Sequence, residues 1–505
     1  MTPSLLTVSK TAPSAKNRFL FFPDRLTLLP SSLPSAFRAI FTNPAIRQAI
    51  PGILAEPFRF KSPLHALPPP QPGAATITAT AAAAGPVADE SVDGFFRRRF
   101  GAALADNLVS AMIHGIYSGD TRALSVRAVF PGLWEAEREW GSVVLAGLFG
   151  GPWRRWGAGA GGRSAYRRKV EADEVEMGRI KTRLREAGGA ELVGAMEGAS
   201  VWGVRGGLEE LTKGVEKWLR AQGVEVWVGE EGAVQSITAE DGAIKVRVPA
   251  SNFTVQPPDT RLTNPLPPHP ASVQLRTATQ TLSPTHLITT LPSLLPPPLA
   301  PSPIPSTTVA VINLAFPRTA GPALFPPGFG YLIPRSVPAA ANPHNVLGVI
   351  FDSDVMPGVD DSAALGVIKA SVLLGGSYWL PANGGPPFPL PAEHELVQRA
   401  LETVRRHFPG TDVPEPFHAR ARVHVDCIPQ VPPGHVAAFQ ADSRRVREFV
   451  AATGVRVGVA GGGVAVVGVN GAVRAGLEVG QSFARDVNGE LEQGEVVVTG
   501  FENWE

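Results

Sequence analysis

The stretch DNLVSAMIHGIYSGDTRALSVRAVFPGLW, residues 106–134, is the most distinctive part of this chain, and RRRFG (97–101) introduces it. It places glycine, aspartate and tryptophan at fixed offsets that the overall composition does not explain. Hydrophobic periodicity around it, from about residue 45 to residue 199, is mainly helical. This stretch therefore predicts a helical region with a defined glycine loop inside it.

The bulk properties exclude several classes of protein. A chain of 505 residues has room for two or three domains. A net charge of +1 gives no general preference for nucleic acid, so we expect no nucleic-acid partner. The single cysteine, Cys427, excludes an internal disulfide and a cysteine-based metal cluster. No apolar run reaches the length of a transmembrane helix.

Alternating and β-branched segments predict strands in both halves of the chain. Pro23-Asp24 predicts the turn of a hairpin over Phe19–Leu29. Two helices are expected over Arg167–Ala187 and from Gly206 to about Gln222. The remaining expected strands are Val224–Val228, a segment beginning near Val234, a strand from His286 that is stopped by Pro292, Val309–Leu314, Gly330–Ile333, Val346–Phe351, Ala370–Leu374 and Val455–Ala460.

Two proline-rich tracts, Pro63–Pro86 and Pro292–Pro305, predict extended linkers without a packed core. The glycines of residues 157–162 follow no strand, so they fail the context test for a dinucleotide fingerprint.

A C-terminal strand, glycine turn and helix form the most informative chemical pattern. Gly461-Gly462-Gly463 and Gly468 separate the strand from a helix that runs through Val473. Free amides at a helix N-terminus attract negative groups, and glycine lets a cofactor approach the backbone closely. A tight packing turn with no ligand is the competing interpretation.

These blocks together resemble the protoporphyrinogen oxidase family in its fungal form, and the resemblance covers most of residues 10–480. Besides residues 106–134, it rests on Asn17-Arg18-Phe19, residues 330–334, residues 348–354 and residues 427–430 (CIPQ). The resemblance implies an α/β fold of the FAD-binding p-hydroxybenzoate-hydroxylase/amine-oxidase-like kind. It also implies a mixed-sheet substrate domain and a helical membrane-binding domain.

The resemblance carries a set of substrate-binding residues. Arg18 matches an arginine beside the substrate's propionates, which suits the forked guanidinium. Gly115 matches a loop that approaches the macrocycle. Leu332, Ile350 and Leu373 match the apolar walls of the tetrapyrrole pocket. On the residues alone, Arg18 is equally a surface arginine, and the three aliphatic residues are ordinary core.

The same resemblance assigns FAD-binding positions and predicts no catalytic residue and no metal site. The cofactor positions are Val234, Thr290, Gly461, Val467, Gly468 and Val469. His114, His435 and His65 have no partner evident in the sequence, so we name no general base. Val466 departs from the family, which usually has glycine there. The family's first segment, with its dinucleotide fingerprint, has no counterpart here, so we expect this chain alone to bind FAD weakly or not at all.

Carried onto this sequence, the family's organisation divides the chain into five segments. Residues 1–45 begin the substrate domain and 296–425 complete it, 46–198 form the helical domain, and 199–295 with 426–505 form the FAD domain. The implied reaction is the O₂-dependent, six-electron oxidation of protoporphyrinogen IX to protoporphyrin IX in haem biosynthesis. The implied setting is peripheral contact with the mitochondrial inner membrane, as a homodimer that hands its product to ferrochelatase.

Two alternatives remain open at this point. One is another flavin amine oxidase on the same fold. The other is a truncated or non-catalytic paralogue that binds porphyrin or a partner without FAD. Bound flavin in the purified chain would separate the second alternative from both enzymes.

Overall fold

The computed structural model describes residues 5–62, 89–149, 165–234, 236–240, 243–247, 275–276, 281–282, 284–297, 299–318, 323–381, 385–387, 389–461, 467–490 and 500. The chain forms two compact units. Unit 1 comprises Met1–Thr76, Gly85–Val215 and Pro305–Pro433, and unit 2 comprises Ile77–Ala84, Glu216–Ile304 and Gly434–Glu505. The five-segment division expected from the sequence stays a prediction.

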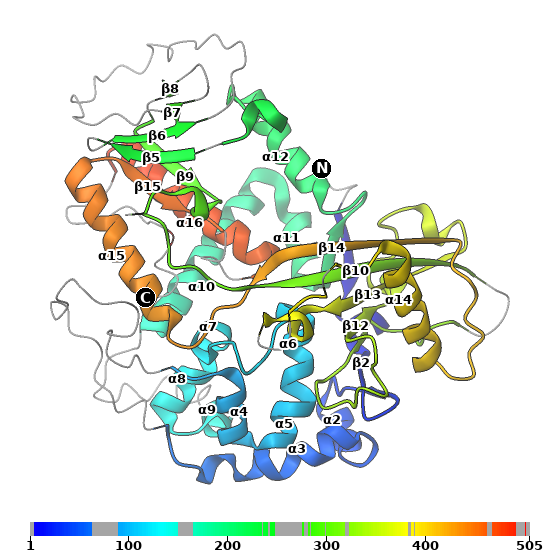
Figure 1. The fold of residues 1–505 in the computed structure, drawn as a ribbon. Helices are drawn as coiled ribbons and strands as arrows, with labels where there is room; N and C mark the ends of the chain where they lie inside the picture. The colour runs from blue at the N-terminus through cyan, green and yellow to red at the C-terminus, as the bar shows by residue number, and fades with distance from the viewer. Residues whose placement is uncertain are drawn as a thin grey trace. The chain divides into compact units, whose positions relative to one another are not determined.

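A seven-stranded mixed sheet forms the centre of unit 1, in the order β14-β10-β13-β12-β11-β2-β3 (Figure 1). The β2–β11 pair is parallel and the other pairs are antiparallel. The strands are β2 (Arg18–Phe21), β3 (Leu26–Leu28), β10 (Ser306–Pro317), β11 (Gly330–Leu332), β12 (Val346–Ile350), β13 (Val367–Gly375) and β14 (His418–Pro429). The expected hairpin and the four expected strands between residues 309 and 374 are confirmed. The edge strand β14 was not foreseen.

The two faces of this sheet differ. Helix α14 (Glu393–His407) covers one face, where Ile312, Val372 and Val404 are fully buried in a single core. Helix α6 (Ser110–Tyr117) packs on β11 and β12. Short elements α13 (Asp352–Val355), η9 (Asp361–Ala363) and η10 (Gly376–Trp379) join the strands.

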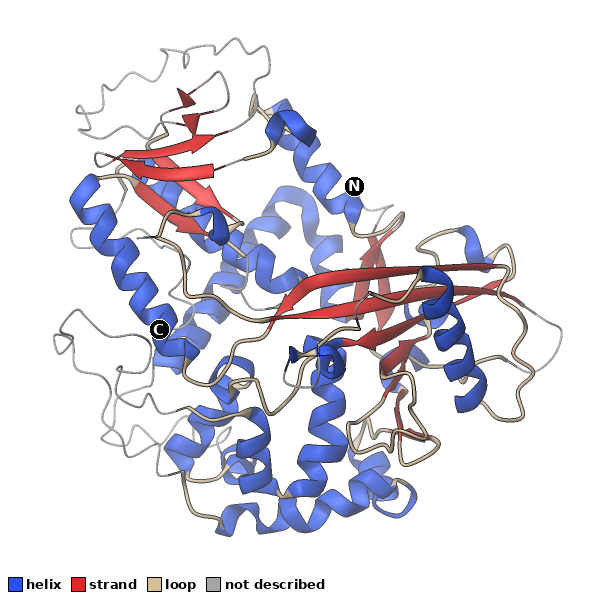
Figure 2. Cartoon of the chain, viewed as in Figure 1, coloured by secondary structure: helices blue, strands red, loops and turns tan. Residues whose placement is uncertain are grey.

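Most of the described helices of unit 1 come from its first 198 residues; Figure 2 draws the helices of the chain in blue and the strands in red. Side-chain caps from Ser32, Asn43 and Ser91 start three of them, because each oxygen accepts otherwise unpaired first-turn amides. The helices are α1 (Pro13–Lys16), α2 (Leu33–Thr42), α3 (Pro44–Ala55), η2 (Glu56–Phe58), α4 (Val92–Phe100), α5 (Ala102–Leu104), η4 (Ala105–Val109), α7 (Val126–Val129), α8 (Pro131–Trp140), α9 (Val143–Phe149), α10 (Ala165–Leu184), η6 (Arg185–Gly189) and α11 (Ala190–Gly198).

A buried ion pair fixes the helices of residues 33–149 to one another. Arg99 and Glu56 are both fully buried and form a side-chain pair. Glu56 also accepts hydrogen bonds from the Ser142 hydroxyl and from the first amides of α9. Those bonds lower the pKa of Glu56, although burial by itself raises it. The charged form of Glu56 is therefore part of the folded structure.

Strand β1 (Leu5–Ser9) pairs antiparallel with β4 (Ala199–Val204) in unit 1. A turn through Gly206 and Gly207, both with positive φ, leads into α12 (Glu209–Ala221). This helix agrees with the one expected from Gly206 to about Gln222.

Unit 2 is built around a parallel pair, β9 (His286–Thr289) with β15 (Arg456–Val459). Helix α16 (Val469–Val487) packs so closely on β15 that a Cβ at Gly458 would lie 2.8 Å from Val479. The other elements are α15 (His435–Thr453), η7 (Gly229–Gly232), η8 (Pro292–Leu294) and the hairpins β5 (Ser236–Glu240)–β6 (Ala243–Arg247) and β7 (Leu275–Arg276)–β8 (Thr281–Leu282).

Two expectations about local structure were wrong. Val224–Val228 forms no strand, because no described segment pairs with it and both terminal valines are exposed. Pro292–Pro305 is not an unpacked linker, since Leu295 and Leu299 are buried. Pro63–Pro86 and the glycines of 157–162 lie outside the described residues. None of the described helices has the length and apolarity needed to cross a membrane.

Candidate functional site

The sheet register brings the expected substrate residues from four strands onto one face. Arg18 on β2 lies opposite Gly330, which lies opposite Ile350 on β12. The neighbouring row runs from Leu332 through Gly348 to Leu373. Directly paired residues point to the same side of a sheet, and residues two apart along a strand share that side. The face that carries these two rows is called the open face below.

Helix α6 closes one part of the open face. A Cβ at Gly115 would lie 2.9 Å from both terminal carbons of Leu332, so any larger residue there would require the Leu332 side chain to move. Next to it, His114 is buried, with Nδ1 2.7 Å from the Ile333 carbonyl and Nε2 2.9 Å from the Ser377 hydroxyl. Burial lowers the pKa of His114 to about 4. Both ring nitrogens are engaged, which makes His114 a fixed support and not a general base.

Arg18 is an exposed cation at the β2 end of this face. Its guanidinium carbon lies 5.5 Å from the centroid of the Phe329 ring. Among the residues that the structure describes, no carboxylate pairs with Arg18. A cation held over a ring and without an anionic partner is available to a ligand carboxylate.

A polar group that the sequence did not single out lies beside the apolar walls. Ser371 faces Ile350 across the strands, and its hydroxyl donates to Asp352 at 2.7 Å and lies 2.8 Å from Asn313 Oδ1. Burial raises the pKa of Asp352, opposed by the Ser371 bond and by Lys369. The sequence showed Asp352 only as part of a motif, because the register that places Ser371 next to it is not visible there.

The carboxyl ends of β9 and β15 bring two expected cofactor residues together. Thr289 pairs with Val459, and the Ala460 amide donates to the Thr289 carbonyl at 3.0 Å. Thr290 and Gly461 therefore follow the ends of adjacent parallel strands. In open α/β sheets, ligands bind at this edge.

The start of α16 provides a second part of the same edge. Gly468 precedes the helix with φ +108°, and no side chain caps the first turn. Gly461 has φ +106°, and a Cβ added at either glycine would meet no other atom within 4 Å. Val467 is half-buried and Val469 is exposed. By contrast, Val234 lies in the loop between η7 and β5 with 38% of its surface exposed.

This edge fits the polar part of a flavin dinucleotide. The uncapped amides of α16 favour a negative group, and the space around Gly461 and Gly468 allows close approach. Of the expected cofactor residues, Thr290, Gly461 and Gly468 are the ones that lie at this edge and would hold this part of FAD. Val466 lies outside the described residues.

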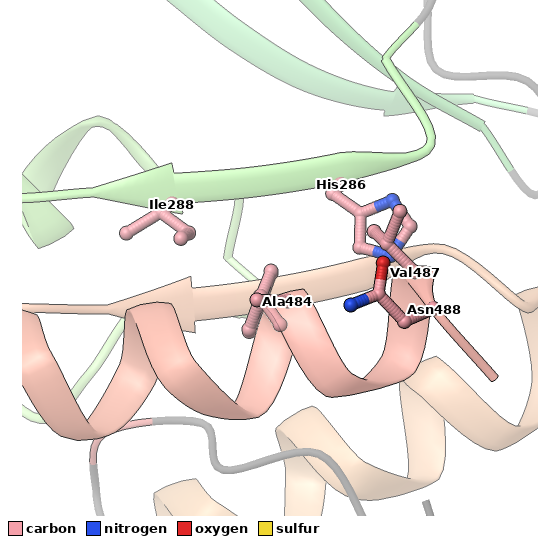
Figure 3. A pocket seen from close by; sticks show the side chains of 6 residues that line it. His286, Ile288, Ala484, Val487 and Asn488 are labelled. Atoms are coloured by element: carbon pink, nitrogen blue, oxygen red, sulfur yellow. The ribbon is translucent and has the colours of Figure 1, made fainter. Parts of the chain in front are cut away.

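A shallow groove in unit 2 lies away from this edge (Figure 3). It is lined by His286, Ile288, Phe483, Ala484, Val487 and Asn488. His286 begins β9 and Asn488 ends α16, so the groove is at the amino end of the strand. His286 and Arg456 both bond Asp486 there, which lowers the pKa of Asp486 although burial raises it. The groove is a structural joint of β9, β15 and α16.

Comparison with known proteins gives the family. A model of the family described as flavin containing amine oxidoreductase matches residues 13–482. The chain belongs to this family.

Several proteins that are similar to this chain are named protoporphyrinogen oxidase. Protoporphyrinogen oxidase from Schizosaccharomyces pombe is 27% identical, over 85% of this chain and 71% of the relative. The human protoporphyrinogen oxidase is 28% identical, over 95% of this chain and 81% of the relative. A solved putative protoporphyrinogen oxidase from Exiguobacterium shares the fold, with a TM-score of 0.51 and 16% identity over 91% of this chain and 78% of that one.

Membership confirms the expected α/β amine-oxidase-like fold and identifies the chain as an FAD-dependent oxidoreductase. The roles of Arg18, Gly115, Leu332, Ile350 and Leu373 remain proposals. So do the roles of the cofactor residues.

Proposed function

We propose that this flavin amine oxidoreductase oxidises protoporphyrinogen IX to protoporphyrin IX, with O₂ as the final acceptor. One observation carries the proposal beyond the family likeness: Arg18, Ile350, Leu332 and Leu373 come from four strands and meet on one open face. A cation at the margin of an apolar floor suits a flat tetrapyrrole with propionates on one edge. The named relatives support the same substrate.

Each residue of the open face has a defined task in this proposal. Arg18 holds a propionate, and the aliphatic rows provide an apolar floor for the macrocycle. His114 and Gly115 fix α6 against Leu332 and so set the width of the floor. FAD, when bound, accepts the substrate hydrogens and passes them to oxygen, so three O₂ become three H₂O₂.

The test measures porphyrin fluorescence after the chain, with saturating FAD, is mixed with protoporphyrinogen IX in air. We expect FAD-dependent porphyrin formation above the spontaneous rate, with equimolar O₂ loss and H₂O₂ gain. Oxidation of a diamine instead of the porphyrinogen would favour the other flavin amine oxidase. Tight porphyrin binding without FAD-dependent turnover would favour the non-catalytic paralogue.

We also propose peripheral attachment to a membrane. Tryptophans and arginines interleave over Trp134–Trp156, so the sequence predicts the contact there, but we propose a different surface. Trp134 is buried at 4% exposure, because it packs in the core of α4 and α6, and residues 150–164 lie outside the described part. Three large apolar side chains of α2 are exposed instead: Leu33 at 88%, Phe37 at 67% and Phe41 at 69%.

The four-residue spacing of these side chains places them on one side of α2. Leu54, Phe58 and Phe60, on α3 and after it, are also exposed. Exposed aromatic and aliphatic side chains of this kind insert into the headgroup boundary of a leaflet without spanning it. The apolar surface of α2 and α3 is therefore the membrane contact that we propose.

Flotation with anionic vesicles tests this surface. Phe37→Asp with Phe41→Asp should abolish co-flotation, because two charges replace inserted rings. Phe417→Asp, at another exposed phenylalanine, is the matched control and should still float. Unchanged flotation of the double variant would refute the assignment.

The cellular setting follows as part of the same proposal. We propose that the protein is located at the mitochondrial inner membrane, in line with the protoporphyrinogen oxidase activity that the names of the relatives give. The homodimer and the hand-over of product to ferrochelatase remain predictions, to be tested by sedimentation and by product transfer between the two purified enzymes.

A further inference from the structure

Strand β14 carries a row of four basic side chains that the oxidation does not use. His418, Arg420, Arg422 and His424 alternate along the strand and are all exposed. Alternate residues of a strand point to the same side, so the four form one row with about 6.7 Å between neighbours. This set is called the basic row below.

The basic row has little compensating negative charge. Arg420 lies 3.7 Å from Glu393, with both side chains exposed. No other described ion pair involves the row, and the β10 residues beside it include the neutral Asn313 and Val311. Exposed pairs of this kind contribute little. The row therefore retains most of its capacity to attract an anion.

The row is too far from Arg18 to share one macrocycle with it. Arg420 pairs with Asn313 on the neighbouring strand, and the row of directly paired residues that starts there ends at Arg18, five strands away. Five strand spacings amount to about 24 Å, and the twist of roughly 20° per strand turns the two ends well out of one plane. The basic row therefore lies at the opposite end of the sheet from the cation that we propose for a propionate.

The outer edge of β14 already binds a carboxylate. The Ala421 amide donates to Glu393 Oε1 at 3.1 Å, so this amide points away from β10. Backbone groups of alternate residues point to the same edge, so those of Ala419 and Val423 also point away from β10. In the described sheet β14 pairs only with β10. An edge without a further paired strand and a row of two arginines and two histidines thus run along the same strand.

We propose that β14 is the docking edge for an acidic β-strand of a partner protein, which adds to the sheet beside it. Carboxylates at every second position of that strand would lie opposite the basic row, with the period of two that any strand imposes. A second copy of this chain does not fit, because two β14 strands would oppose like charges. This inference does not depend on the proposed reaction.

Fluorescence anisotropy with a short labelled peptide of alternating glutamate and threonine tests the proposal. We expect saturable binding to the full chain, and much weaker binding of a peptide with the same composition and its glutamates contiguous. Arg420→Glu with Arg422→Glu should weaken binding by about tenfold or more, from two reversed cross-strand pairs. Arg179→Glu with Arg183→Glu on α10 is the matched control and should bind normally.

Two further variants separate strand addition from attraction by charge alone. Ala421→Pro removes one outward amide and no charge, so it should weaken the alternating peptide, with circular dichroism checking the fold. Glu393→Ala removes the competing carboxylate and should strengthen binding. Equal binding of both peptides to the unaltered chain would overturn the proposal, as would binding unaffected by Arg420→Glu with Arg422→Glu. Binding of phosphatidylserine vesicles that survives Phe37→Asp with Phe41→Asp and is lost in Arg420→Glu with Arg422→Glu would also overturn it and assign the row to a lipid surface.

Discussion

Replacing Arg18 by alanine tests the substrate face at the cation that we propose holds a propionate. The side chain pairs with no described carboxylate and lies over Phe329, so its loss leaves no buried partner unsatisfied. The fold should therefore keep its stability. A lost charge-assisted hydrogen bond costs about 1.5–3 kcal/mol, and the exposure of Arg18 favours the lower end. Porphyrin affinity should fall about ten- to hundredfold.

The assay is quenching of intrinsic tryptophan fluorescence by protoporphyrin IX, which requires neither flavin nor turnover. Arg18→Lys should recover part of the affinity, because lysine keeps the charge and loses the fork. Arg25→Ala, in the turn of the same hairpin, is the matched control and should bind like the unaltered chain. Equal affinity for Arg18→Ala, or an equal loss in Arg25→Ala, would show that Arg18 is only a surface residue.

Two more predictions concern the fold and the cofactor. Glu56→Gln should lower the free energy of unfolding by about 3–5 kcal/mol in urea titrations, because Arg99 loses its buried partner. Glu197→Gln, at an exposed carboxylate, is the control and should change the free energy of unfolding little. Equal free energies of unfolding for the two variants would contradict the prediction. Folding lowers the pKa of Glu56 below its ordinary value of 4.5. The stability that Glu56 contributes is therefore complete above pH 4.5 and is lost as the pH falls through the lowered pKa of the folded state. Acid titrations of the unaltered chain and of Glu56→Gln would show this difference. Gly468→Val should weaken FAD binding in flavin-fluorescence titrations, because a residue with a side chain is strained at φ +108°. Gly480→Ala, in the middle of α16, is the control and should bind FAD normally. Equal FAD affinities of the two variants would exclude Gly468 from the cofactor site.

Local pattern determined much of the secondary structure. The strands β10 to β13 and the β2–β3 hairpin are visible in the sequence because alternation and turn residues act over a few positions. The β15–turn–α16 unit was visible for the same reason, since its glycines mark the backbone freedom that the turn requires.

Distant pairing decided what the sequence could not show. Val224–Val228 has the composition of a strand but no described partner, and a strand is stable only within a ladder. Tryptophan is a residue type expected at a membrane surface, yet the helices around Trp134 bury its side chain and so exclude that role.

The site depended on both levels. Likeness to a family could name Arg18, Leu332 and Ile350 individually, but their presence on one face follows from a register that joins segments more than 300 residues apart. The basic row of β14 was hidden for the same reason: its residues gain a common side and an open edge only when β14 becomes the last strand of the sheet. The local sequence determines secondary structure and the chemistry of individual residues, whereas tertiary packing determines which strands become neighbours in a sheet.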